Sequence, residues 1–192
     1  MTSTITLIDE PRGLLRRCAW RYSKKTFGKV VEPVRATAHH TGVLMAAGAL
    51  ESVAGKTWHV LDEHLRWLAI QKVSSEIGCT WCTDYGYYLG VQSGIDPRKV
   101  TDVPQWRESD VYDDRERVVL EYAEVATRTP VTMTDELAER LRALFSSAEI
   151  VELVAWVALE NYRSRTNAGL GLRSEGFSDS CAVQPTPLRA SA

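Results

Sequence analysis

The stretch HLRWLAIQKVSSEIGCTWC, residues 64–82, decides the fold of this chain. Apolar side chains recur at helical spacing before the first cysteine, and this pattern predicts a long helix over about 57–77. Gly78 is expected to end that helix, because glycine readily adopts the left-handed conformation found just after many helices. A second helix is predicted to begin at the Cys-x-x-Cys motif.

Helical spacing recurs along the rest of the chain, whereas alternating strand patterns are nearly absent. A short helix is predicted after Pro97. Longer helices are predicted over RERVVLEYAEVATR, TMTDELAERLRALF and SSAEIVELVAWVALENYRSRTNAGLG. Each of these three begins beside an Asp, Thr or Ser that can cap a helix. We therefore predict an all-α domain of six to seven helices behind an N-terminal extension.

The composition is that of an ordinary globular protein, with 192 residues, of which 44% are hydrophobic and 25% charged. No apolar run approaches the ~18–20 residues that span a bilayer, and no signal peptide is recognised. Residues 1–40 hold eight Lys and Arg against three Asp and Glu, while the remainder holds 15 against 22. Because the body is acidic, we expect the basic arm to dock on its own body or a neighbouring subunit, and we expect no nucleic acid or membrane partner.

Cys79 and Cys82 are two of only four cysteines in the chain. Without a secretory signal, a Cys-x-x-Cys motif is more typical of redox or metal chemistry than of a structural disulfide. Three interpretations stay open: a redox couple, half of a zinc site, or two buried apolar side chains. Zinc is disfavoured because the other two cysteines are isolated and the adjacent His39 and His40 point apart.

The position of the motif favours thiol chemistry. Both cysteines are predicted in the first turn of a helix, where unpaired backbone N–H groups and the helix dipole stabilise a negative sulfur. Their spacing places both sulfurs on one helix face, close enough to form a disulfide. A peroxide would oxidise one sulfur to a sulfenic acid, and the other sulfur would condense with it.

This chemistry also needs a group that transfers protons. Asp84 lies two residues beyond the second cysteine, and Glu76 lies three residues before the first. On the preceding helix, Glu63 and His64 are further candidates for a proton relay.

Four segments in order resemble the carboxymuconolactone decarboxylase and alkylhydroperoxidase D-like (AhpD-like) family. They are HLRWLAIQKVSSEIGCTWC, SGIDPRKV, DDRERVVLEYAEVATRTPVTMTDELAERLRALFSSAEIVEL and ENYRSRTNAGLGLRSEGFS. The resemblance implies an AhpD-like all-α bundle that forms homo-oligomers, as dimers, trimers or hexamers. We expect three parts: a basic extension at 1–32, the helical domain at 33–177, and a flexible tail at 178–192.

The resemblance also implies an activity. Members with the Cys-x-x-Cys motif are thiol-dependent peroxidases or disulfide reductases, antioxidant enzymes of the peroxiredoxin type. In the best-understood members the second cysteine attacks the peroxide and the first resolves the sulfenic acid, so Cys82 would attack and Cys79 would resolve. We expect a cytoplasmic enzyme with no cofactor or metal, acting on a hydroperoxide or disulfide and using an external thiol reductant.

Two positions depart from the family's pattern. The peroxidase motif CxxCxxxH has a histidine where this chain has Gly86, and a glutamate twelve residues before the first cysteine, where this chain has Trp67. Both members of the usual proton relay are therefore replaced. We predict that Asp84, or one of the three other candidates named above, takes over proton transfer. General acid–base help is worth about 10²–10⁴-fold, so its loss would weaken a peroxidase without removing dithiol chemistry.

Two other functions stay open. The chain could be a family enzyme that decarboxylates or isomerises a small carboxylic acid, bound by Asn161, Arg163 and Arg165. It could instead be a non-catalytic oligomeric redox sensor, in which a disulfide changes subunit packing. Activity that survives loss of both cysteines would favour the first, and oxidation without turnover would favour the second.

Overall fold

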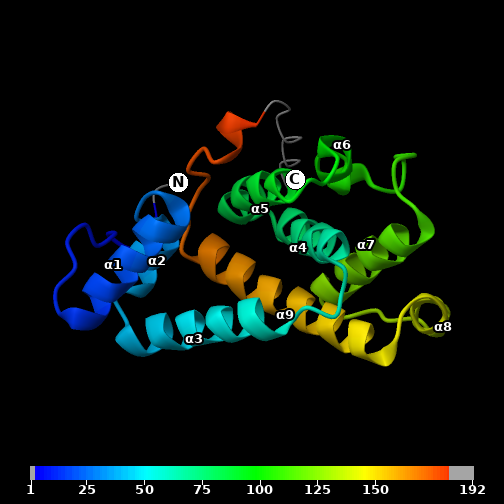
Figure 1. Cartoon of the computed structure of the whole chain (residues 1–192), viewed down its shortest axis with the longest axis horizontal. Coiled ribbons are helices and arrows are strands. Elements are labelled where there is room, and N and C mark those ends of the chain that lie inside the picture. The colour runs from blue at the N-terminus through cyan, green and yellow to red at the C-terminus, as the bar shows by residue number, and fades with distance from the viewer. Residues whose placement is uncertain (1–2, 182–192) are drawn as a thin grey trace. The chain divides into compact units, whose positions relative to one another are not determined.

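The structure is a computed structural model, and it describes residues 3–181. These residues are helical and contain no β-strand, so the predicted all-α fold class is confirmed (Figure 1). The α-helices are α1 (Leu14–Phe27), α2 (Glu32–Thr37), α3 (Thr41–Thr57), α4 (Glu63–Ile77), α5 (Thr80–Gln92), α6 (Pro97–Thr101), α7 (Asp114–Thr127), α8 (Asp135–Leu144) and α9 (Ser147–Gly169), and the 3-10 helices are η1 (Val103–Gln105) and η2 (Ser178–Ser180). Most of the predicted flexible tail, residues 182–192, lies outside the described residues. Among the helices described here, none combines the length and apolar character that crossing a membrane requires.

The described chain divides into two compact units. One comprises the residues up to Trp58 together with Gly169–Leu172, and it holds α1, α2 and α3. The other comprises His59–Ala168 and the residues from Arg173 onward. The second unit therefore holds α4 to α8, nearly all of α9 and the cysteine motif. The domain boundaries expected from the sequence stay a prediction.

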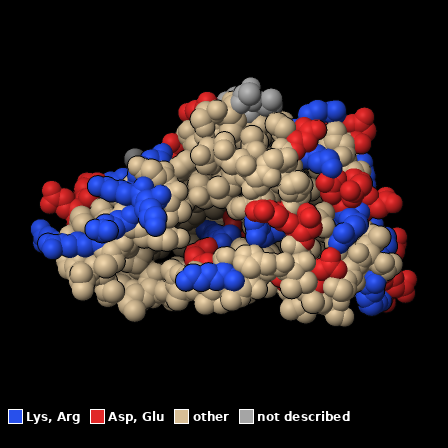
Figure 2. Space-filling model, viewed as in Figure 1, with Lys and Arg blue, Asp and Glu red and all other residues tan. Residues whose placement is uncertain are grey.

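The N-terminal segment packs within the first unit. The Thr4 N–H donates to the Leu170 carbonyl at 3.0 Å, and Trp20 Nε1 donates to the Asp9 carbonyl at 3.3 Å. Exposed Lys and Arg side chains of α1 gather over this helix in Figure 2. The basic arm is therefore tied to its own unit by hydrogen bonds.

Local sequence signals set the two ends of α4. Asp62 caps the start by accepting backbone N–H groups of the first turn, and Gly78 ends the helix in the left-handed conformation with φ 77°. The helix predicted over 57–77 therefore ends where expected but begins later, at Glu63. The reason is that α3 continues to Thr57, and a short non-helical link precedes the Asp62 cap.

Residues on all sides of α4 are buried, and it packs against α5 and α7, beside which it lies in Figure 1. One cluster of buried side chains connects α4 with η1, α7 and the loop between them: Leu68, Val103, Trp106, Tyr112 and Leu120. Full burial of such an apolar side chain contributes about 1.5–3 kcal/mol. Because α5 begins directly after α4, this packing also fixes the start of the helix that carries the cysteines.

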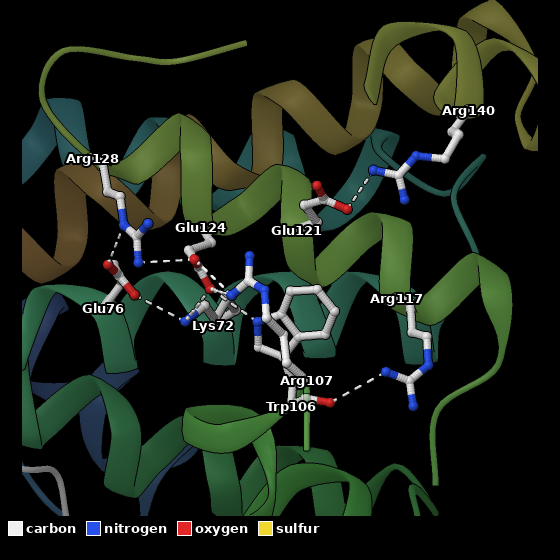
Figure 3. A network of polar contacts seen from close by, with 9 residues as sticks. All are labelled: Lys72, Glu76, Trp106, Arg107, Arg117, Glu121, Glu124, Arg128 and Arg140. Carbon is white, nitrogen blue, oxygen red and sulfur yellow. Dashed lines mark hydrogen bonds and ion pairs between the residues drawn. The ribbon is translucent and has the colours of Figure 1, made fainter. Parts of the chain in front are cut away.

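A network of charges joins α4 and α7 (Figure 3). Lys72 Nζ lies 3.0 Å from a Glu124 oxygen and 2.9 Å from a Glu76 oxygen. Arg128 pairs with both carboxylates, and Arg107 pairs with Glu124. Lys72 and Glu124 are only 4% and 2% exposed. Since an unpaired buried charge is costly, these pairs are needed to keep the α4–α7 contact stable.

Candidate functional site: a buried dithiol

The two cysteines of the motif lie at the N-terminus of α5, as predicted. Cys79 is the N-cap residue, and its Sγ accepts the Cys82 N–H at 3.3 Å. Gly78 makes this possible, because its left-handed conformation turns the chain from the end of α4 directly into α5. Both side chains are buried, with Cys79 1% and Cys82 6% exposed, and both are free thiols rather than a disulfide.

Polar side chains of α9 complete the surroundings of the sulfurs. Asn167 Nδ2 donates to Cys82 Sγ at 3.3 Å. The Ser164 hydroxyl donates to Glu160 Oε1 at 2.6 Å. Glu160 is 3% exposed, and its charge raises the pKa of both thiols. The site therefore pairs two thiols with one buried carboxyl group, one hydroxyl and one amide.

The surroundings shift the pKa values of the two thiols in opposite directions. A hydrogen bond from the Cys82 thiol lowers the pKa of Cys79, and the hydrogen bond from the Cys82 backbone N–H lowers it further. Burial acts in the opposite direction. Burial raises the pKa of Cys82, and its hydrogen bond to Cys79 and the nearby Glu160 raise it further. Burial also raises the pKa of Glu160, against the effect of Arg163. Negative charge is thus favoured on Cys79, and the shared proton on Cys82.

Asp84 is held by the segment that follows α9. Its Oδ1 accepts the Ser178 N–H at 2.7 Å, and its Oδ2 accepts the Phe177 N–H at 3.0 Å and the Glu175 N–H at 3.1 Å. The Ser174 hydroxyl also donates to Oδ2, at 2.9 Å. Burial alone would raise the pKa of Asp84, but these hydrogen bonds hold it below its usual value. The carboxylate is therefore engaged in anchoring residues 174–178, and its predicted part in proton transfer stays a prediction.

Aromatic side chains cover the same part of α5. Trp81 Nε1 donates to Glu175 Oε2 at 2.7 Å. The Phe177 ring contacts the rings of Trp81, Tyr85 and Tyr88, with centroids 4.9–6.2 Å apart. Residues 174–178, which we call the strap, therefore bind α5 through one carboxylate and one aromatic cluster.

The other predicted relay residues lie at the far end of α4 or pair with other groups. Glu63 and His64 are exposed in the first turn of α4, while the cysteines follow its last turn, about 20 Å away at 1.5 Å per residue. Glu76 is paired with Lys72 and Arg128 in the network of Figure 3. The predicted role of these three residues in proton transfer stays a prediction.

The two positions that depart from the family pattern have clear local surroundings. A Cβ atom on Gly86 would lie 2.6 Å from Oε1 of Gln71, whose side chain is buried and donates to the Thr83 carbonyl at 3.2 Å. The glutamine amide thus occupies the space beside α5 that a larger residue at position 86 would need. Trp67 is half-buried and donates to Glu63 Oε1 at 3.3 Å.

The basic residues considered for carboxylate binding have internal partners. Arg165 donates to the Thr127 carbonyl at 2.7 Å, and Asn161 donates to the Thr127 hydroxyl at 3.1 Å. Arg163 pairs with Glu160 at 3.2 Å. In the described part of the chain, no group of three or more His, Cys, Asp and Glu side chains could hold a metal ion.

The sequence reasoning missed Glu160, Ser164 and Asn167 as parts of the site. The signal was present, because these polar residues recur at helical spacing on the face of α9 that also buries Trp156 and Val157. A polar stripe inside an apolar helix indicates that its members have specific buried partners. The sequence does not say which partners, since the cysteines lie about eighty residues earlier.

Comparison with known proteins places this geometry in a known structural class. No family model matches the chain. A curated relative, the uncharacterized protein YnjA of Escherichia coli (strain K12), is 28% identical over 164 residues, which cover 85% of this chain and 90% of YnjA.

Two sets of solved structures share the fold. The debrominase Bmp8 aligns with a TM-score of 0.79 and 19% identity, covering 92% of this chain and 94% of Bmp8. A cysteine-to-alanine variant of Bmp8 has been solved with 2,3,4-tribromopyrrole. A protein of unknown function from Agrobacterium tumefaciens, a candidate antioxidant defence protein AhpD, aligns with a TM-score of 0.68 and 25% identity over 72% of this chain and 94% of its own. The fold is that of the AhpD-like proteins, which confirms the resemblance seen in the sequence.

Proposed function

We propose that the chain is an AhpD-like thiol-dependent oxidoreductase whose Cys79/Cys82 couple reduces a hydroperoxide or a disulfide. The observation that carries the proposal is the pair of free thiols at the N-terminus of α5, where Cys79 Sγ accepts the Cys82 backbone N–H at 3.3 Å. A thiolate is the nucleophile in such chemistry, and a neighbouring thiol allows a disulfide to close. The likeness to a candidate antioxidant defence protein supports the same reading.

The reaction of the couple with a hydroperoxide is a two-electron reduction. A thiolate sulfur attacks the distal peroxide oxygen, the O–O bond breaks, and the alkoxide takes a proton to leave as an alcohol. The resulting sulfenic acid is attacked by the second sulfur, which loses its proton while the hydroxide leaves as water. The products are one disulfide, one alcohol and one water, and an external thiol must return the couple to the dithiol.

The charge distribution favours Cys79 as the attacking sulfur. The pKa of Cys79 is lowered and that of Cys82 is raised, so the thiolate fraction lies mainly on Cys79. The family resemblance implies the reverse order, with Cys82 attacking. The two orders differ in which single-cysteine variant keeps a fast first oxidation, so the same experiment decides between them.

A second candidate function is reductive dehalogenation. It is favoured by the shared fold with the debrominase Bmp8. A dithiol can replace a carbon–bromine bond by a carbon–hydrogen bond, with bromide and a proton released and the disulfide formed. This reaction would use the same two sulfurs with an electrophilic halogenated substrate in place of a peroxide.

The remaining expectations are part of the proposal. They are an external thiol reductant, assembly into a homo-oligomer and a cytoplasmic location. An enzyme acting on a small carboxylic acid and a non-catalytic redox sensor stay as outcomes that the following experiment separates.

The experiment counts free thiols before and after one equivalent of an organic hydroperoxide, with mass spectrometry to locate any disulfide. We expect the wild type to lose two thiols and to form a Cys79–Cys82 disulfide. Cys82→Ser should form a sulfenic acid on Cys79 at a rate close to wild type, and Cys79→Ser should react far more slowly. The opposite ranking would assign the attack to Cys82. Thiols that stay reduced at millimolar peroxide would rule out the peroxidase.

A catalytic assay then separates the alternatives. Turnover with a thiol reductant supports the oxidoreductase, whereas a disulfide that forms once and is not recycled by any thiol reductant supports a sensor. Bromide release from a bromopyrrole in the absence of peroxide reduction would select dehalogenation. Conversion of a small carboxylic acid by a variant lacking both cysteines would select the third alternative.

A further inference from the structure

Asn167 is a buried amide that donates a hydrogen bond to one sulfur of the couple. It lies in the last turn of α9 and is 5% exposed. Its Nδ2 donates to Cys82 Sγ at 3.3 Å, across 85 residues of sequence. Burying an amide costs free energy unless new hydrogen bonds replace those to water. The contact with the sulfur therefore explains how a polar donor is accommodated at this buried position.

The two sulfurs receive different donors. Cys79 Sγ accepts the backbone N–H of Cys82 at 3.3 Å, a bond that belongs to the N-terminus of α5 itself. Cys82 Sγ accepts the Asn167 amide N–H, which comes from another helix. A substitution at Asn167 therefore removes a donor from one sulfur and leaves the donor of the other in place.

The geometry points to Asn167 as a catalytic residue that stabilises negative charge on Cys82 Sγ while the disulfide closes. The inference rests on the proposed dithiol function and adds a group that makes the second cysteine reactive. An N–H donor stabilises a thiolate more than a neutral thiol, because hydrogen bonds to an ionised partner are roughly twice as strong as neutral ones. The amide provides this stabilisation without gaining or losing a proton.

Closure needs this stabilisation once Cys79 carries a hydroxyl group or a mixed disulfide. The Cys82 S–H bond breaks, and its sulfur attacks Cys79 Sγ to form the new S–S bond. The bond from Cys79 Sγ to its substituent breaks, and hydroxide or a thiolate departs with both bonding electrons. This leaving group takes the Cys82 proton and becomes water or a thiol. Negative charge therefore passes through the sulfur that accepts the Asn167 N–H.

The other charged and titratable groups that act on Cys82 oppose its thiolate. Burial raises the pKa of the Cys82 thiol, and its hydrogen bond to Cys79 on α5 and the charge of Glu160 on α9 raise it further. The Asn167 donor acts in the opposite sense, because a hydrogen bond to the charged form favours that form. Loss of the donor should therefore make Cys82 less reactive.

The test measures the reactivity of each sulfur separately and without peroxide. Methyl methanethiosulfonate, a small reagent that reacts with thiolates, is applied at neutral pH to Cys79→Ser and to Cys82→Ser. Peptide mass spectrometry follows the remaining cysteine of the couple. Each protein is compared with the same protein carrying Asn167→Leu, which keeps the branched shape of the side chain and removes its N–H.

In Asn167→Leu we expect modification of Cys82 to slow about 3–12-fold. One hydrogen bond to a charged group shifts a pKa by about one to two units, and a Brønsted slope of about 0.4–0.5 offsets nearly half of that change in rate. Modification of Cys79 should stay within about twofold, since its donor is the Cys82 backbone N–H. With both cysteines present, disulfide closure after reaction with hydroxyethyl disulfide should slow by a similar factor.

Glu152→Gln is the matched control. Glu152 is also buried on α9, but its carboxylate accepts the Val60 N–H at 2.8 Å and the Trp156 indole N–H at 3.3 Å. This variant should leave both modification rates within about twofold. Thermal unfolding followed by circular dichroism shows whether each variant is folded, and Asn167→Ala provides a second variant that lacks the N–H.

An unchanged rate at Cys82 in a folded Asn167 variant would overturn the role of Asn167. Equal slowing at both sulfurs would also overturn it, because the effect would then come from altered packing or access. A wild type that ignores peroxide would refute the peroxidase, while the modification rates of Cys82 would still decide the role of Asn167.

Discussion

At the scale of single residues, Gly86 shows how a small residue shapes this site. Glycine in a helix interior costs about 1 kcal/mol relative to alanine, so its presence needs a reason. That reason is the buried Gln71 amide, which a Cβ atom on Gly86 would approach to 2.6 Å. The family motif has a histidine at this position, and the structure shows which side chain takes up the space instead.

Gly86→Ala is expected to destabilise the fold by about 1–3 kcal/mol, because overpacking displaces Gln71 from a filled interior. In a Gln71→Ala background the same substitution should be neutral or stabilising, since the helix-propensity gain then acts alone. Urea unfolding of the four proteins in this double-mutant cycle measures the difference. Equal effects in both backgrounds would show that Gln71 is not the obstacle.

At the scale of elements, the helix ends follow local capping chemistry. Asp113 and Glu116 form a capping box at the start of α7, and Thr134 caps α8. These ends were predicted from the sequence because each signal lies within four residues of the helix it starts. The strap is different, since its binding to α5 depends on Asp84, about ninety residues earlier in the chain.

Asp84→Asn is expected to loosen the strap by about 2 kcal/mol, the scale of hydrogen bonds to a charged group. The amides of Glu175, Phe177 and Ser178 should then exchange with solvent about thirtyfold faster, as measured by hydrogen exchange. Asp110→Asn is the control, because that exposed carboxylate pairs with Arg98 and not with the strap. Unchanged exchange of the three amides in Asp84→Asn would contradict this account.

The pKa of Asp84 is lowered, so its contribution to the strap has a defined pH dependence. The stabilisation is present above the pKa of an unfolded aspartate, about 3.9, and is lost as pH falls through the lower folded value. Exchange of the strap amides, corrected for intrinsic rates, should therefore reveal weaker protection only in acid.

At the scale of the whole molecule, acid stability depends on the charge network between α4 and α7. Burial opposes ionisation of Glu124, but hydrogen bonds from Arg107, Trp106 and Lys72 lower its pKa to about 2. Since the folded value lies below the unfolded one, the stabilisation is complete above about pH 4.5. It is lost as pH falls toward 2.

Glu124→Gln is expected to cost about 3 kcal/mol at neutral pH, because it leaves the buried Lys72 with one carboxylate fewer. The free energy of unfolding of this variant should also fall less than that of the wild type between about pH 4.5 and 2. Urea unfolding across that range measures both effects. Glu121→Gln, which removes a half-exposed pair with Arg140, should cost less than about 1 kcal/mol. Full acid dependence in Glu124→Gln would refute the assignment.

The sequence by itself determined the helical class, the end of α4 and the start of α5. It also predicted the redox couple, because Gly78, Cys79 and Cys82 are neighbours and their helix-terminal position follows from local backbone geometry. Signals of this kind act over one or two helical turns, so they can be recognised without knowing how the helices pack.

Only the tertiary structure decided the surroundings of the sulfurs. Asn167 on α9 donates to the sulfur of Cys82, 85 residues away in the chain, while the strap takes up Asp84. Glu63 and Glu76 were reasonable candidates because they are close in sequence. Glu63, however, lies at the far end of α4, and Glu76 is paired with Lys72 and Arg128. Which polar side chain meets a thiol is set by long-range packing, and that is not encoded at any one position.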